Sequence, residues 1–299
     1  MSADVSAVVV SFNAREELLL CLRSLEAQPE RLLEVLVVDN ASSDGSAAAA
    51  RDAFPRFRVL ENPSNLGFAK ANNRALREAR GRYALVLNSD ARLSAGALAT
   101  LAGYLDAHPQ VAVVGPRTRD AAGGVQVSFG PPLLPLDEWR QRRLVRGVKA
   151  GLDWARHEAE RLAAVECEPA WVSGSCFLAR LDALQAVAFF DEGYFLYEED
   201  ADLCLRLRQA GWRIAYTPEA EVVHRLGASM EQAQALARVE YQKSHLRYYA
   251  KHNGPLLSAA LRTYLAVGSA LRLGGAALAG DSQEHAVQSA ILRAALTIV

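Results

Sequence analysis

The sequence predicts an α/β protein in which a mostly parallel sheet is flanked by helices and followed by a C-terminal helical region. Short apolar runs alternate with helical patterns at a pace that requires crossover connections between parallel strands. The chain has 299 residues, of which 51% are hydrophobic and 22% charged, the balance of a folded protein with one large domain and an appendage. We therefore expect a main domain at residues 1–230 and a helical region at 231–299.

The first half of the chain carries the clearest alternation. Runs rich in Val and Leu, bounded by polar turns, are typical of fully buried strands. The expected strands are Val5–Val10, Glu34–Val38, Phe57–Glu61, Tyr83–Leu87 and Val111–Val114. The expected helices between them are Glu16–Ala27, a segment that ends at Ala53, Gly67–Ala79 and Ala95–His108.

The pattern loosens in the middle and then returns. Residues 116–135 are rich in Gly and Pro and predict a mobile loop, and residues 137–164 predict either a solvated helix pair or an acceptor-side lid. Gly211 follows the pattern of Glu199–Ala210 and favours a helix end there. Two edge strands are expected next, at Arg213–Tyr216 and Ala220–His224.

Charge and cysteine usage exclude several classes of protein. The formal net charge is −1, so no global attraction to nucleic acid is expected. Four cysteines lie far apart without a CxxC pair, which indicates reduced thiols rather than a disulfide framework or a zinc knuckle. The N-terminus shows no secretion signal. We expect a cytoplasmic protein.

Polar side chains follow three of the predicted strands. Ligands of open parallel sheets bind beyond the carboxyl ends of the strands, so these residues predict a site. Asp39 could accept from a nucleobase or ribose, or could form an Asx-turn or helix cap. Asp90 could hold Mg²⁺ or Mn²⁺ against a diphosphate, or could cap the next helix. The polar residues at the three strand ends are Ser11, Asn13, Asp39, Asn40, Asn88, Ser89 and Asp90.

The segment NPSNLGFAKANN joins a predicted strand to a predicted helix. Gly67 permits close approach of the backbone to a ligand, and Lys70 can reach a phosphate. Asn65 and Asn72 offer amide groups. Neither GxGxxG nor GxxxxGK[ST] occurs, so the sequence supports neither a dinucleotide fold of the dehydrogenase type nor a P-loop.

Four carboxyl groups gather at the start of a predicted helix in YEEDADLCLR. Acidic residues favour helix N-termini through the macrodipole, but four exceed what a cap requires. Their mutual repulsion would raise at least one pKa toward the range of a general base. His224, at the end of EVVH, could be a structural residue or a metal ligand. The acidic residues are Glu198, Glu199, Asp200 and Asp202.

Seven segments together resemble the family-2 glycosyltransferases with a GT-A (Rossmann-like) fold, particularly bacterial rhamnosyl- and galactofuranosyltransferases. They cover about residues 5–230. The segments are VVVSFN, VVDNASSDGS, NPSNLGFAKANN, LVLNSDA, WVSGSCFLAR, FDEGYFLYEEDADLCLRLRQAGW and VVHRLGAS. Each segment alone is weak, but seven in family order are specific.

The resemblance implies a role for individual residues. Asp39 matches the nucleoside-binding aspartate, with Ser11 and Asn13 on the donor side. Asp90 matches the last aspartate of the metal-binding DxD motif. Asn88 replaces the first aspartate of that motif, so metal affinity is expected to depend on the donor diphosphate. In the Glu199-Asp200 pair the aspartate is the implied base. His224 is a further implied metal ligand. The implied acceptor-side residues are Trp171, Ser173 and Gly174.

The resemblance also implies an inverting hexosyl- or deoxyhexosyltransferase of cell-surface polysaccharide synthesis. Its donor would be dTDP-rhamnose or a UDP-sugar, its acceptor a glycan or a lipid-linked sugar, and its cofactor Mg²⁺ or Mn²⁺. Two alternatives stay open at this point: a sugar-nucleotide nucleotidyltransferase, and an inactive protein that binds nucleotide-sugars or acts as a scaffold.

The C-terminal region predicts helices with a break at Gly254-Pro255. Lys243, Arg247 and Lys251 recur every four residues and form a basic stripe. Residues 256–279 are mostly apolar, but two arginines each cost about 2.5–3.5 kcal/mol at a bilayer centre, so a spanning helix is not expected. These helices are expected to pack on the catalytic domain or a second subunit of a homodimer, or to lie peripherally on the inner face of the membrane.

Overall fold

The computed structural model describes residues 4–225 and 234–297. The chain divides into two compact units. The sheet unit comprises Met1–Asp191 with Asp200–Ala228, and the helical unit comprises Glu192–Glu199 with Ser229–Val299. The domain boundary expected at residue 230 lies outside the described residues.

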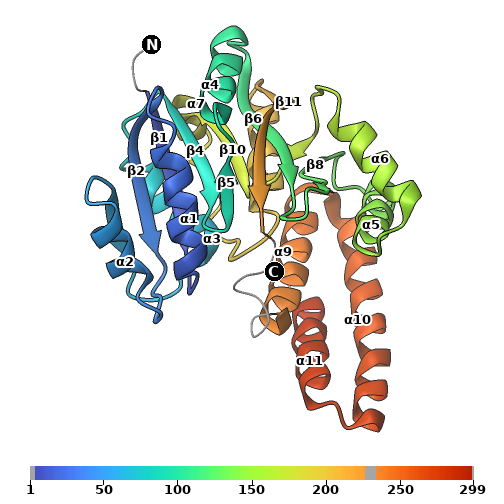
Figure 1. Ribbon diagram of the computed structural model, residues 1–299. Helices are drawn as coiled ribbons and strands as arrows, with labels where there is room; N and C mark the ends of the chain where they lie inside the picture. The colour runs from blue at the N-terminus through green and yellow to red at the C-terminus, as the bar shows by residue number, and fades with distance from the viewer. Residues whose placement is uncertain (1–3, 226–233, 298–299) are drawn as a thin grey trace. The chain divides into compact units, whose positions relative to one another are not determined.

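The sheet unit is built on a nine-stranded mixed sheet with the order β3-β2-β1-β4-β10-β6-β11-β5, and with β7 paired to β6 (Figure 1). The pairs β1·β2, β1·β4, β2·β3 and β6·β11 are parallel, whereas β10 is antiparallel to both of its neighbours. The strands are β1 (Val5–Ser11), β2 (Leu32–Asp39), β3 (Arg58–Glu61), β4 (Tyr83–Asn88), β5 (Ala91–Leu93), β6 (Val111–Arg119), β7 (Val125–Gln126), β10 (Cys176–Arg180) and β11 (Arg213–His224).

Helices cover both faces of this sheet because the central strands are apolar on both sides. Val9 of β1 belongs to a core formed with α1 and α4, and the preceding residue, Val8, belongs to a second core formed with α3, α6, α7 and α8. The helices of the sheet unit are α1 (Arg15–Glu26), α2 (Ser46–Ala53), α3 (Gly67–Leu76), α4 (Ala97–Ala107), α5 (Pro135–Lys149), α6 (Asp153–Ala163), α7 (Leu181–Ala186) and α8 (Glu199–Gln209).

The predicted α/β fold class with a C-terminal helical region is confirmed, and two local expectations are corrected. Residues 116–135 are not simply a loop, because β6 continues to Arg119 and the segment also holds β7 and β8 (Phe129–Gly130), which pairs with β9 (Trp171–Val172). The two expected edge strands are one strand, β11, between β6 and β5. The turn-like residues after Thr217 form a register shift within it, not a chain reversal.

The helical unit contains α9 (Gln234–His252), α10 (Gly254–Ala279) and α11 (Ser282–Leu296). The predicted break at Gly254-Pro255 is confirmed, because α9 ends and α10 begins there. Helix α11 is capped by Asp281, whose side chain accepts a hydrogen bond from Glu284 N. In the described part of the chain, no helix combines the length and the apolar character needed to span a membrane.

Candidate active site

The carboxyl ends of β1, β2 and β4 place the predicted polar residues on one rim of the sheet. Ser11 pairs in register with Asp39, and Val10 pairs with Asn88. Neighbouring strands lie about 4.8 Å apart, so the ends of β2 and β4 are separated by roughly 10 Å. From Asn88 the rim continues to the next strand, because its N–H donates to Ser175 O at 2.9 Å.

Asp39, at the end of β2, has one paired and one unpaired carboxylate oxygen. Its Oδ2 accepts a hydrogen bond from Ser42 N, three residues on, at 3.0 Å, which holds the turn after β2. Its Oδ1 is buried and has no hydrogen-bond partner among the described residues, and the same holds for Ser11 Oγ. Buried polar atoms are normally paired, so these two oxygens indicate where a ligand with hydrogen-bond donors would bind.

Asn13 shapes the loop after β1. Its backbone has φ +48°, its N–H donates to Ser42 Oγ at 2.9 Å, and its Oδ1 accepts from Ser43 N at 2.8 Å. The side chain therefore ties the β1 loop to the β2 loop. Asn13 therefore contributes to the predicted donor site indirectly, by positioning the loop after β1.

The loop before α3 is held by Asn40, a residue whose amide reaches across the rim. Asn40 Nδ2 donates to Asn65 Oδ1 at 2.9 Å and to Gly67 O at 3.2 Å, and its Oδ1 accepts from Leu66 N at 3.0 Å. Gly67 has φ +79°, which a side chain would strain. Asn65 is thus part of the loop's internal network.

Two predicted donor residues lie on α3 itself. Lys70 is exposed, so its ammonium group is available to an anionic ligand. Asn72 is buried, and its Nδ2 donates to Phe68 O at 3.0 Å while its Oδ1 has no hydrogen-bond partner within the described chain. Asn72 therefore offers a second unpaired acceptor on this side of the sheet.

Asp90 and His224 come together although 133 residues separate them in the chain. His224 Nε2 lies 3.1 Å from Asp90 Oδ1 and 3.4 Å from Asn88 Nδ2. Helix α4 has Gly96 at its N-cap and no capping side chain, which excludes the alternative that Asp90 caps it. Ser89 is half-buried between the two residues of the motif.

Gln126 fixes the orientation of the His224 ring. Its Oε1 lies 3.1 Å from His224 Nδ1, and its Nε2 donates to His224 O at 2.6 Å. An acceptor oxygen at Nδ1 leaves Nε2 as the ring nitrogen that faces Asp90. A nitrogen and a carboxylate oxygen 3.1 Å apart can share a hydrogen bond, and the same two atoms are of the kind that bind a divalent metal.

Asp90 and His224 fit a metal site in which a bound substrate supplies the remaining metal ligands. Within residues 4–225 and 234–297, no group of three or more His, Cys, Asp or Glu side chains could hold a metal. The protein thus offers Asp90 and His224 as two ligands. Mg²⁺ is commonly bound by one or two carboxylates together with substrate phosphates, so a donor diphosphate would supply the missing oxygens.

Asp200 is held at the next part of the rim by two backbone N–H groups. Its Oδ2 accepts from Gly174 N and its Oδ1 from Ala201 N, both at 2.8 Å. Burial raises the pKa of the Asp200 carboxyl above its ordinary value, and the two N–H groups partly oppose this effect. A Cβ on Gly174 would lie 3.2 Å from the Phe68 ring, so glycine permits this close approach.

The remaining predicted residues near Asp200 divide into two kinds. Glu199 is 4% exposed and begins α8. Asp202 instead accepts from Arg206 Nε at 2.6 Å one turn along the helix, which indicates a structural role. On the acceptor side, Trp171 Nε1 donates to Pro131 O at 2.9 Å, and Ser173 Oγ accepts from Ser175 N at 3.2 Å. These two residues shape the loop that presents Gly174.

Two residues that organise this rim were not assigned functions from the sequence. Gln126 falls within the segment that its composition marked as a loop, and nothing local to it indicates a partner 98 residues away. Asn40 adjoins Asp39 and was singled out only as a strand-end amide. The signal that could have found Asn40 is its position, since a second polar residue directly after a buried strand lies at the same rim.

The fold and this rim define a glycosyltransferase with a GT-A fold. The profile described as "Glycosyl transferase family 2" matches residues 6–164, and the chain belongs to this family. N-acetylglucosaminyl-diphospho-decaprenol L-rhamnosyltransferases of two Mycobacterium tuberculosis strains are 33% identical to it, over 91% of this chain and 95% of their own. The expectation of a family-2 enzyme similar to rhamnosyltransferases is confirmed, and the nucleotidyltransferase alternative is not supported.

Solved structures show the same fold. A mannosyltransferase from Pyrobaculum calidifontis in complex with GDP-Man and Mn²⁺ superposes with a TM-score of 0.58 at 20% identity, over 98% of this chain and 86% of its own. GalNAc-T7 with UDP, GalNAc and Mn²⁺ superposes with a TM-score of 0.60 at 14% identity, over 82% of this chain and 47% of its own. At these identities the likeness concerns the fold.

Proposed function

We propose that this glycosyltransferase moves a sugar from a nucleotide-diphosphate donor to the hydroxyl of a lipid-linked or glycan acceptor, with inversion at the anomeric carbon. The observation that carries the proposal is Asp200, held by Gly174 N on the same rim as the unpaired Asp39 Oδ1. The mycobacterial relatives suggest rhamnose as the sugar and a lipid diphosphate as the carrier of the acceptor. Rhamnose from a dTDP donor is our first choice, and UDP-sugars are next.

The donor nucleoside would bind at the ends of β1 and β2. Asp39 Oδ1 and Ser11 Oγ, both buried and unpaired within the described residues, accept and exchange hydrogen bonds with the base or the ribose. Lys70, exposed on α3, can neutralise phosphate charge.

Asp90 and His224 would hold Mg²⁺ or Mn²⁺, with Gln126 fixing the His224 ring. The ion, when bound, neutralises charge on the departing nucleoside diphosphate. Asn88 leaves the motif one carboxylate short, so the donor diphosphate contributes to metal affinity.

Asp200 acts as the general base, with Glu199 beside it in the chain. The acceptor oxygen forms a bond to the anomeric carbon while the bond from that carbon to the phosphate oxygen breaks, and the hydroxyl proton passes to Asp200. Attack opposite the leaving group inverts the configuration. The raised pKa of Asp200 makes its carboxylate a stronger proton acceptor than an exposed aspartate.

Asp200→Asn tests this assignment. The amide keeps the size of the side chain and can still accept from Gly174 N, so donor binding should be unchanged while kcat falls by about 10³-fold or more. Transfer can be followed with dTDP-rhamnose and a short lipid-linked acceptor, and donor binding by calorimetry.

A matched control is Asp182→Asn. Asp182 also lies in the first turn of a helix, and its Oδ1 also accepts from the next residue, Ala183 N, at 2.7 Å, but it is exposed on α7. It should keep full activity. Transfer by Asp200→Asn at the rate of the control would remove Asp200 from the reaction, and donor binding without turnover in the wild type would favour an inactive binding protein.

A further inference from the structure

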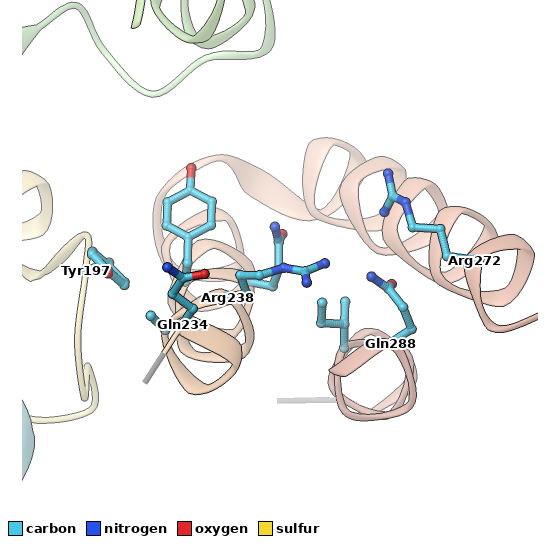
Figure 2. A pocket seen from close by; sticks show the side chains of 9 residues that line it. Tyr197, Gln234, Arg238, Arg272 and Gln288 are labelled. Carbon is cyan, nitrogen blue, oxygen red and sulfur yellow. The ribbon is translucent and has the colours of Figure 1, made fainter. Parts of the chain in front are cut away.

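The helical unit contains a pocket of about 460 Å³, within the size range of small-molecule sites (Figure 2). Ala237 and Ile291 are its only lining residues with purely apolar side chains. The pocket is lined by Tyr197, Gln234, Ala237, Arg238, Tyr241, Gln242, Arg272, Gln288 and Ile291. Seven of its nine lining side chains carry a polar group, so a ligand there can make hydrogen bonds as well as apolar contacts.

The charge in this pocket favours an anion. Arg238 is paired with Glu284, with contacts of 2.7 and 3.0 Å, and this pair, together with the Gln288 hydrogen bond and the nearby charge of Arg272, lowers the pKa of Glu284 to about 2, so the carboxylate stays ionised. Arg272 is exposed, and no described residue accepts a hydrogen bond from its guanidinium. Two guanidinium groups thus face one carboxylate, which leaves a net positive charge, and the Arg272 guanidinium matches the geometry of phosphate oxygens.

Gln288 adds a second requirement. This side chain is 1% exposed, its Nε2 donates to Glu284 Oε1 at 2.7 Å, and its Oε1 has no hydrogen-bond partner among the described residues. A buried carbonyl oxygen beside a pocket needs a donor such as a hydroxyl. A sugar phosphate has both groups, because its phosphate can bind Arg272 and one of its hydroxyls can donate to Gln288 Oε1.

Tyr197 lines this pocket and belongs to the chain segment that leads to Asp200. Tyr197 packs edge-on against Tyr241 at 5.8 Å, has φ +71°, and precedes Asp200 by three residues in the sequence. Helix α9 holds the same segment, since Ser244 Oγ donates to Leu196 O at 2.7 Å and His245 Nδ1 lies 2.6 Å from Glu198 Oε1. One helix therefore lines the pocket and positions the residues that lead to the base.

The helix that carries Arg272 also exposes an apolar face. Leu271 is 74% and Leu278 93% exposed, and α10 contains no Asp or Glu. Residues three or four apart lie on one face of a helix. The exposed large apolar residues that follow this spacing are Leu256, Tyr264, Val267, Leu271 and Leu278. An anion whose carrier is apolar fits this surface better than a free nucleotide does.

We propose that this pocket binds the phosphate-bearing head of the lipid-linked acceptor, a proposal that rests on the transfer function above. Arg272 binds the phosphate oxygens, Gln288 Oε1 accepts from a hydroxyl of the attached sugar, and the lipid chain lies along the exposed face of α10. The same helix–loop contacts then link acceptor binding to the segment before Asp200.

Binding of farnesyl diphosphate in EDTA, measured by calorimetry, tests the pocket without turnover and without metal. Arg272→Gln should weaken binding about tenfold, because one charge-assisted contact is lost. Arg272→Lys should restore part of it. The matched control is Arg293→Gln, which removes an exposed arginine of α11 outside the pocket lining and should bind as the wild type does.

Two further probes separate the sources of the anion. Inorganic pyrophosphate should bind more weakly than farnesyl diphosphate, and farnesol should show no difference between wild type and Arg272→Gln. Equal binding of pyrophosphate and farnesyl diphosphate would overturn the lipid assignment. Gln288→Leu should weaken only a probe whose diphosphate carries a sugar.

The outcome is independent of the catalytic assignment. Asp200→Asn should bind farnesyl diphosphate as the wild type does. If Arg272→Gln also binds it with wild-type affinity, the pocket proposal fails whatever the transfer assays show. If Asp200→Asn still transfers sugar, the assignment of the base fails while the binding result stands.

Discussion

The sheet unit and the helical unit are held together differently. The sheet unit buries two large apolar cores, one on each face of the sheet, with fully buried residues such as Leu85 and Leu178 in β4 and β10. The described helical unit buries two clusters of three residues, Val239–Val287–Ile291 and Leu246–Leu265–Ala295. The candidate active site, which must hold reacting groups in place, lies on the extensively packed sheet unit. The proposed acceptor pocket lies on the helical unit, which has the smaller apolar clusters.

The side chains of the two candidate sites show the same contrast. In the sheet unit, Asp200 is fixed by two backbone N–H groups and His224 by both ends of the Gln126 amide. In the helical unit, Arg272 is exposed and no described residue accepts from its guanidinium. Preorganised groups suit a transition state, whereas a flexible cation suits a ligand that brings its own charge.

The largest effect should come from deleting core volume. Leu85→Ala in the sheet unit should lower the free energy of unfolding by about 2–5 kcal/mol, because a cavity remains between packed layers. Leu271→Ala on the exposed face of α10 should change it by less than about 0.5 kcal/mol. Urea denaturation of both variants measures this difference, and a large loss in Leu271→Ala would show that protein covers this face.

A smaller effect should follow from loosening the preorganised rim. Gln126→Ala removes both contacts to His224 and should weaken Mn²⁺ binding in the presence of the nucleotide diphosphate by about 10–100-fold. Titration of Mn²⁺ followed by electron paramagnetic resonance measures it. The control is Gln110→Ala, an exposed glutamine on the loop before β6. If Gln126→Ala binds Mn²⁺ with unchanged affinity, Gln126 does not position His224 for metal binding.

The smallest effect concerns pH. Because burial raises the pKa of Asp200, the carboxylate is protonated at a higher pH than an exposed aspartate would be. Transfer should therefore fall as the pH decreases through this raised pKa, so the acid limb of the kcat/KM profile should lie above the ordinary aspartate range. Asp182→Asn should show the same acid limb of the kcat/KM profile as the wild type. An acid limb at the ordinary aspartate pKa would contradict the buried environment assigned to Asp200.

The parallel half of the sheet could be read from the sequence because its strands are local apolar runs separated by helical patterns. The strand β10 could not, because nothing local to Cys176–Arg180 indicates that it inserts antiparallel between β4 and β6, which are distant in the chain. The single strand β11 was divided in two because Pro218 follows Thr217 in a turn-like stretch that the fold uses as a register shift. Neither feature is visible without the neighbouring strands.

The sequence by itself determined the fold class and the rim at which Asp39 and Asp90 lie, because periodicity and strand ends are local properties, and its seven motifs indicated the family by resemblance. Only the tertiary structure decided which atoms remain unpaired at that rim, that Gln126 orients His224, and that Arg272 and Gln288 share a pocket. Such contacts join residues far apart in the chain, and their geometry depends on the packing of whole elements against one another.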